Sequence, residues 1–86
     1  MIYEYDENKS LSNKQKHGID FEEAQLLWKD DRMLEIETSY EDEVRLINIG
    51  KIGTRFYTIV TTYRTDNIRI ISARRSRKKE IEIYES

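Results

Sequence analysis

The spacing of apolar residues changes at Met33, and this change constrains the fold more than any other feature of the sequence. Before it, Phe21, Ala24, Leu27 and Trp28 fall on one face of a helix. After it, apolar and polar residues alternate with the period of two that is typical of strands. Because helices come first and strands follow, we expect an α+β fold.

Two short helices, residues 8–17 and 20–29, are predicted before this change. Gly18 follows the first helix and supplies a residue that readily takes a positive φ at a helix end. Asp20 and Glu23, three residues apart, have the spacing of a capping box at the start of the second helix. Both helices are expected to cover one face of the sheet that follows.

The second part of the chain is predicted to form a sheet. Four strands, separated by turn residues at Gly50, Gly53 and Thr65–Asn67, are expected at residues 33–37, 44–49, 55–64 and 67–73. Short turns favour an antiparallel meander. Residues 2–5 alternate like a further short strand, and Ser76 is expected to cap a final helix that runs to Tyr84. The predicted architecture is an antiparallel sheet of about four to five strands, with two N-terminal helices packed on it and a C-terminal helix.

Composition excludes several classes of protein. The chain has 86 residues, enough for one core, so residues 1–86 are expected to form a single domain. It has no cysteine, which excludes disulfides, thiolate zinc sites and a cysteine nucleophile. No apolar run approaches the ~18 residues that span a bilayer, and the first residues lack a signal-peptide pattern. We therefore expect a cytoplasmic protein that does not act at a membrane.

Charge is distributed unevenly along the chain. The net charge is −2, yet residues 1–45 carry 13 acidic and 6 basic side chains, whereas residues 46–86 carry 4 acidic and 9 basic ones. A basic segment within an acidic chain favours a local anionic target such as RNA. The alternative is that the acidic half neutralises the basic half within the fold.

The basic residues gather toward the end of the chain. A period of two places Arg74 on one face of the last strand with Ile68, Ile70 and Ser72, and the intervening residues on the other. Arg74 and Arg75 are therefore not expected to face the same groove. Guanidinium groups suit phosphate because they stay charged and donate two parallel hydrogen bonds. A solvated charged surface is the alternative to the predicted RNA-binding residues Arg69, Arg75, Arg77, Lys78 and Lys79.

His17 is the only histidine, and no carboxylate cluster has the spacing of metal ligands, so neither a metal nor another cofactor is expected. RNA can be cut without metal through its own 2′-hydroxyl if the protein supplies a base, an acid and cations. His17 could be that acid or base, or only a favourable charge at a helix end. Tyr84, four residues after Glu80, could stack on a base, donate a proton or dock the last helix.

Two segments of the chain resemble the BrnT family, also called domain of unknown function 497. The first has the spacing D-x-x-K-x-x-x-N-x-x-K-H-G-x-x-F-x-x-A and begins at Asp6. The second is the run RIISARR that begins at Arg69. It is preceded by Arg45 with Ile49-Gly50 and by Thr62-x-Arg64, and followed by Glu80 and Tyr84.

The resemblance implies a RelE/ParE-like toxin of a type II toxin-antitoxin system, an endoribonuclease that cleaves RNA without the ribosome. It also implies a hetero-oligomer with a BrnA-type ribbon-helix-helix antitoxin, which binds the operator of its own operon. Arg64 and Arg74 would bind phosphate and stabilise the transition state, with Lys16 and His17 in proton transfer or phosphate binding. Glu80 and Tyr84 would have secondary roles. Alternatives are a binding module of the same fold, a toxin with a non-RNA target, and a nucleic-acid-binding domain.

Overall fold

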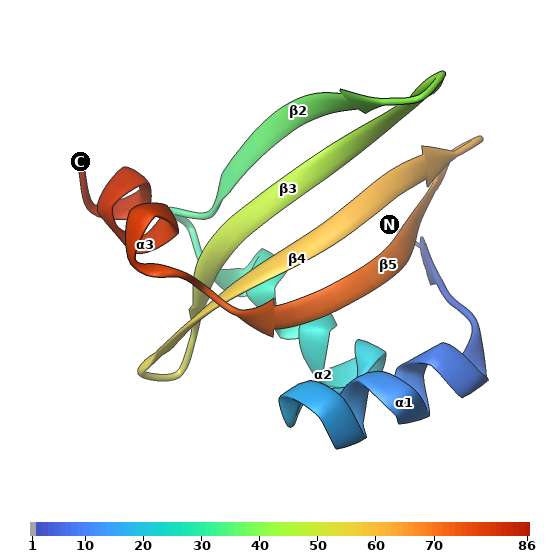
Figure 1. Ribbon diagram of the computed structural model, residues 1–86, viewed down its shortest axis with the longest axis horizontal. Coiled ribbons are helices and arrows are strands. Elements are labelled where there is room, and N and C mark those ends of the chain that lie inside the picture. Colours follow the sequence, from blue (N-terminus) through green and yellow to red (C-terminus); the bar gives the residue numbers. More distant parts are fainter. Residues whose placement is uncertain (1) are drawn as a thin grey trace.

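The computed structural model describes residues 2–86, and it confirms an α+β fold (Figure 1). In chain order the elements are β1 (Ile2–Glu4), α1 (Glu7–His17), α2 (Phe21–Ala24), a 3₁₀ helix η1 (Gln25–Lys29), β2 (Leu34–Tyr40), β3 (Glu43–Ile52), β4 (Arg55–Arg64), β5 (Asn67–Arg75) and α3 (Lys78–Glu85). The predicted second helix is thus an α-helical turn continued by a 3₁₀ helix.

The sheet has the strand order β1-β5-β4-β3-β2 and is mixed, so the prediction of an antiparallel sheet was wrong in one respect. The four strands from β2 to β5 form the expected meander, in which each strand pairs antiparallel with its sequence neighbour. β1 pairs parallel with β5 at residues 67–69. No hairpin joins these two strands, so no turn fixes their relative direction.

The two N-terminal helices cover one face of the sheet, as predicted. Figure 1 shows α1 and α2 together on one side, with α3 at the end of the sheet away from the β2–β3 turn. Asp20 and Glu23 form the predicted capping box of α2, Asp6 caps the start of α1, and Gly18 ends α1 with φ of 76°. The core consists of side chains from the α1–α2 connection, α2, η1, β4 and β5: Ile19, Phe21, Ala24, Leu27, Ile59, Ile70 and Ala73.

Polar side chains attach α1 to the rest of the fold. The Asn13 amide nitrogen donates 2.8 Å hydrogen bonds to the carbonyls of Ile19 and Ala73, and its oxygen accepts from the Ala73 amide at 3.4 Å. The Ser10 hydroxyl accepts from the Phe21 amide at 2.9 Å. Because these contacts are buried, they fix the position of a helix that has few apolar residues of its own.

The predicted face pattern of the last strand was partly wrong because β5 contains an irregularity. The pairing shifts where Val60 lies opposite Ser72 and Thr61 opposite Ile70, so Ile71 has no counterpart on β4. Ser72 and Arg74 therefore lie on the face opposite to Ile70. The separation of Arg74 from Arg75 holds, because both lie beyond the shift.

Two predicted boundaries are corrected. Gly50 is buried inside β3 instead of forming a turn, and a Cβ there would lie 3.0 Å from Leu27 Cδ1 and 3.1 Å from Asp30 Oδ2. The residue that caps α3 is Arg77 and not Ser76, whose hydroxyl lies 2.8 Å from that of Thr58. In both places a tertiary contact takes precedence over a local turn or cap preference.

Candidate functional site

The sheet face that α1 and α2 leave uncovered carries arginines at both ends. Residues paired across strands share a face, so the register places Arg45, Thr62 and Arg69 in one row across β3, β4 and β5. Arg64 lies two residues beyond Thr62 on the same face. Arg69 forms an ion pair with Glu4 at 3.6 Å.

Apolar side chains separate this row from a second basic position. Ile36, Ile47 and Val60 lie next to one another across β2, β3 and β4, in line with Ser72 of β5. Ile36 is 36% exposed, and the other two are half-buried. We call these three side chains the apolar band. Arg74 lies beyond the band on β5, opposite Thr58.

Arg74 is held by a bidentate ion pair. Its Nη1 and Nη2 donate to the two carboxylate oxygens of Glu80 at 2.8 Å each, and Nη1 also donates to the Arg75 carbonyl at 3.3 Å. Glu80 comes from the first turn of α3. The Nε proton and one Nη2 proton of Arg74 have no acceptor among residues 2–86. The guanidinium is thus fixed in orientation while two donors stay available.

The Glu80 carboxylate also accepts hydrogen bonds from the Thr58 hydroxyl at 3.0 Å and from the Arg77 amide at 2.7 Å. The hydrogen bonds from Arg74 are the main reason that the pKa of Glu80 falls from 4.5 to about 2, against the opposing effect of burial. The same contact raises the pKa of Arg74. Glu80 is therefore ionised at neutral pH and cannot donate a proton there.

We expect Glu80→Gln to destabilise the fold at neutral pH by up to ~3 kcal/mol, the free energy that corresponds to this pKa shift. A folded-state pKa below the unfolded value stabilises the fold above pH 4.5, and the effect is lost as the pH falls toward 2. Urea unfolding between pH 7 and pH 2 measures it. Glu82→Gln, on the exposed side of α3, is the matched control. If Glu80→Gln lowered the unfolding free energy by the same amount at every pH, the charge of Glu80 would not contribute to stability.

Tyr84 lies one helical turn after Glu80 and is fixed in a second cluster. Its hydroxyl donates to Asp30 Oδ2 at 2.7 Å, and its ring meets Phe56 edge-on with centroids 5.4 Å apart. The hydrogen bond to Asp30 is the main reason that the pKa of Tyr84 is raised. Burial disfavours the ionised Asp30, but the Arg32 amide, the Tyr84 hydroxyl and the Lys51 amide outweigh it and lower the Asp30 pKa. Tyr84 therefore keeps its proton, directed at Asp30.

Lys16 and His17 line a different pocket at the C-terminal end of α1. The pocket, of about 240 Å³, is completed by Lys9, Ser12, Asn13, Phe21, Ile71 and Ser72. Asn13 anchors this end of the helix to Ala73, as described above. Ser72 connects the pocket to the uncovered face, where Arg74 lies two residues further along β5, a distance of about 7 Å.

The structure thus brings together part of the predicted site. Arg74 and Glu80 are in contact, and Tyr84 lies one turn after Glu80 on α3. The pocket with Lys16 and His17 lies beside β5, the strand that carries Arg74. Arg64 lies six residues along β4 from Thr58, the partner of Arg74, a separation of about 20 Å.

The predicted RNA-binding residues do not form one surface. Arg75 lies on the helix-covered side, with its guanidinium 5.8 Å from the Tyr57 ring centre, whereas Arg69 lies on the uncovered side. Arg77, Lys78 and Lys79 are exposed at the start of α3. Sequence reasoning missed Thr58, Asp30, Arg32 and Lys51, because their roles depend on contacts between distant segments that carry no local pattern.

Some properties of the whole chain bear on its class. Among residues 2–86, no three histidine or acidic side chains form a group that could hold a metal ion. Within the same residues, no helix has the length and apolar character required to cross a membrane. The fold and site define a small α+β protein with arginines on an open sheet face, an arrangement suited to an anionic ligand.

The chain belongs to the BrnT family. The family model described as "Ribonuclease toxin, BrnT, of type II toxin-antitoxin system" matches residues 5–80. No curated protein matches the chain. Family membership makes the protein a ribonuclease toxin, with RNA as its target and an antitoxin as its partner.

Proposed function

We propose that this toxin is an endoribonuclease that cleaves RNA without a metal ion and without the ribosome, and that Arg74 is the centre of its active site. The observation that supports this proposal is the guanidinium of Arg74, which Glu80 fixes through two 2.8 Å hydrogen bonds while two N–H donors remain available. A preoriented cation is what a phosphate that gains negative charge in the transition state requires.

The proposed reaction uses the 2′-hydroxyl of the RNA itself. The 2′-oxygen attacks the neighbouring phosphorus atom, and the bond from phosphorus to the 5′-oxygen of the next nucleotide breaks. A base accepts the 2′-hydroxyl proton, and an acid protonates the departing oxygen. The products are a 2′,3′-cyclic phosphate and a 5′-hydroxyl end. Atoms and charge balance without any further reactant.

His17 and Lys16 are the proposed proton-transfer and phosphate-binding residues. Both line the pocket that Ser72 connects to the face of Arg74. Glu80 positions Arg74 and is not the acid, because its low pKa keeps it ionised. Tyr84 is not the base, because its proton is directed to Asp30 and its pKa is raised.

If His17 transfers a proton, its replacement should slow the chemical step of RNA cleavage. We expect His17→Gln to lower kcat by about 100-fold or more. His17 is exposed, so the substitution should leave the unfolding free energy nearly unchanged. An unchanged kcat in His17→Gln would show that His17 is a helix-end residue without a part in catalysis.

Arg64 and Arg69 are proposed to bind the RNA strand away from the cleaved bond. The separation of about 20 Å between Arg64 and Arg74 suits contacts to different phosphates. We expect Arg64→Ala to raise KM several-fold with little change in kcat, because an exposed cation without a hydrogen bond within residues 2–86 contributes binding free energy. The exposed Arg55, in an Arg55→Ala variant, is the control. A loss of kcat with unchanged KM would instead place Arg64 at the reacting phosphate.

The proposal is tested with purified toxin and RNA in the presence of EDTA and in the absence of ribosomes. We expect fragments with 2′,3′-cyclic phosphate and 5′-hydroxyl ends. Cleavage that EDTA abolishes, or that needs added ribosomes, would contradict it. Absence of any cleavage by a folded protein that still binds its antitoxin would favour the alternative, a RelE/ParE-like binding module or a toxin with another target.

We propose a BrnA-type ribbon-helix-helix antitoxin as the partner, with the complex bound to its own operator through the antitoxin and located in the cytoplasm. The uncovered sheet face supports the inhibitory part of this proposal. It offers the apolar band between Arg45 and Arg69 on one side and Arg74 on the other. A segment with apolar and acidic side chains would complement this face and block the approach to Arg74.

A further inference from the structure

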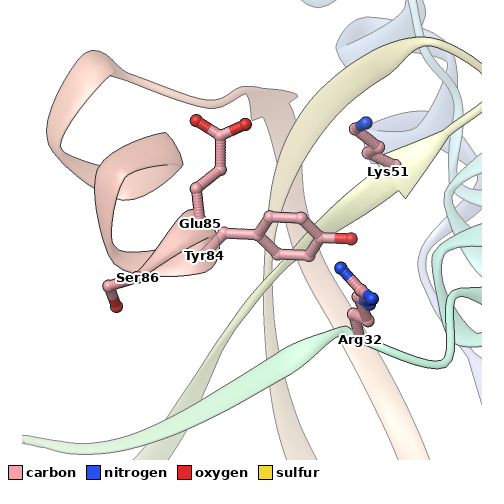
Figure 2. A pocket seen from close by; sticks show the side chains of 5 residues that line it. All are labelled: Arg32, Lys51, Tyr84, Glu85 and Ser86. Atoms are coloured by element: carbon pink, nitrogen blue, oxygen red, sulfur yellow. The ribbon is translucent and has the colours of Figure 1, made fainter.

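A pocket of about 650 Å³ lies between the end of α3 and the start of β2. Arg32, Lys51, Tyr84, Glu85 and Ser86 line it. Figure 2 shows the Tyr84 ring extending between Arg32 and Lys51, whereas the Glu85 carboxylate points away from these two cations. Two positive groups from different segments thus border one opening, which no sequence pattern indicated.

Within the part of the chain that the structure describes, the charged groups of Arg32 and Lys51 act on their surroundings without a direct polar contact, since both influence the Asp30–Tyr84 pair through space. Among residues 2–86, neither the Arg32 guanidinium nor the Lys51 ammonium has a hydrogen bond or an ion pair, although Lys51 Nζ lies 5.0 Å from the centre of the Phe56 ring. Asp30 is the nearby acid, and its oxygens already accept from the Arg32 amide, the Lys51 amide and the Tyr84 hydroxyl. Glu85 also lines the pocket, but its carboxylate points away from the two cations, so the positive charge is concentrated on the side of Arg32 and Lys51 (Figure 2).

The walls of the pocket are held in place. The Asp30 carboxylate accepts hydrogen bonds from the backbone amides of Arg32 and Lys51, so it fixes the two chain segments relative to each other. The same carboxylate holds the Tyr84 hydroxyl, and Phe56 packs against the Tyr84 ring. A pair of cations on such a support is preoriented, which lowers the entropy lost when an anion binds.

We propose that Arg32 and Lys51 form a phosphate-binding subsite for the RNA strand, separate from the phosphate at Arg74. This inference rests on the proposed function for the identity of the ligand. Glu80, which holds Arg74, and Tyr84, which forms the wall of the pocket, are four residues apart on α3 and so lie about 6 Å apart on one face of that helix. One strand that passes α3 can therefore place one phosphate at Arg74 and another at the subsite.

The test measures binding of a fluorescent single-stranded deoxyoligonucleotide, which lacks the 2′-hydroxyl and is not cleaved. We expect Arg32→Ala combined with Lys51→Ala to weaken binding about tenfold and to reduce the slope of log K against log salt by roughly 0.7, the value for one phosphate on a single strand. Arg55→Ala is the matched control for the loss of an exposed cation. Arg32→Lys combined with Lys51→Arg should retain most of the affinity.

Probes with and without a 5′-phosphate identify which phosphate occupies the subsite. A defect seen with both probes indicates an internal phosphodiester, and a defect seen only with the phosphorylated probe indicates a terminal phosphate. Equal affinity of the wild-type protein and the double variant for both probes would overturn the inference, provided that urea unfolding shows both to be folded. Since this readout needs no cleavage, a toxin that binds through Arg32 and Lys51 but never cuts RNA would contradict only the proposed function.

Discussion

Replacing Arg74 with alanine is expected to lower kcat for RNA cleavage by about 100-fold or more, because one oriented donor to a charged transition state is worth that much. The change also leaves Glu80 without its bidentate partner, so the unfolding free energy should fall by about 1–3 kcal/mol. Kinetics and urea unfolding on the same preparation separate the two effects.

Two further variants test whether orientation matters in addition to charge. Arg74→Lys keeps the positive charge but cannot form two parallel hydrogen bonds to Glu80, so kcat should remain well below the wild-type value. Glu80→Gln keeps the guanidinium but weakens its support, and it should reduce kcat less than Arg74→Ala does. Full activity of folded Arg74→Ala would remove Arg74 from the active site.

Binding of the antitoxin should have the second large effect. A partner that binds only the folded toxin stabilises it by about 2.7 kcal/mol at 100 times Kd. For a chain of this size that raises Tm by more than ~10 °C. The complex should also fail to cleave RNA if, as proposed, the partner covers the face that carries Arg74. Thermal unfolding and an RNA assay of the co-purified complex measure both quantities.

The apolar band supplies a sharp control for this prediction. Ile36→Asp places a charge on the band and should weaken antitoxin binding by at least tenfold. Leu11→Asp alters a more exposed apolar side chain, 63% accessible, on α1 and should have no such effect. A complex that still cleaves RNA, or one that Ile36→Asp leaves intact, would show that inhibition occurs elsewhere.

Features encoded within a few residues were predictable from the sequence. Asp20 and Glu23 cap α2 as expected, and Gly18 ends α1 in the left-handed region. Tyr84 and Glu80 lie on one helix with the predicted spacing. Each of these follows from backbone geometry that the residue and its immediate neighbours determine.

Features that depend on distant segments were not predictable in the same way. The parallel pairing of β1 with β5 and the unpaired Ile71 result from the whole sheet, and the latter reverses the face of Ser72 relative to Ile70. The pairing register likewise decides that Arg64 lies far from Arg74. Family resemblance indicated candidate residues one by one, but how these residues are grouped in space depends on the three-dimensional arrangement.

Asn13 occupies part of the edge of the sheet at β5 that β1 leaves unpaired. β1 pairs only with residues 67–69 of β5, so the rest of β5 would present open backbone groups to any passing strand. The Asn13 amide accepts from the Ala73 N–H and donates to its carbonyl, as a neighbouring strand would. One side chain thus occupies the two backbone groups of Ala73 that an incoming strand would pair with, and it does so from the helix whose last residues are Lys16 and His17. A mutation that restored the open edge should therefore also release the end of α1 that carries these two residues.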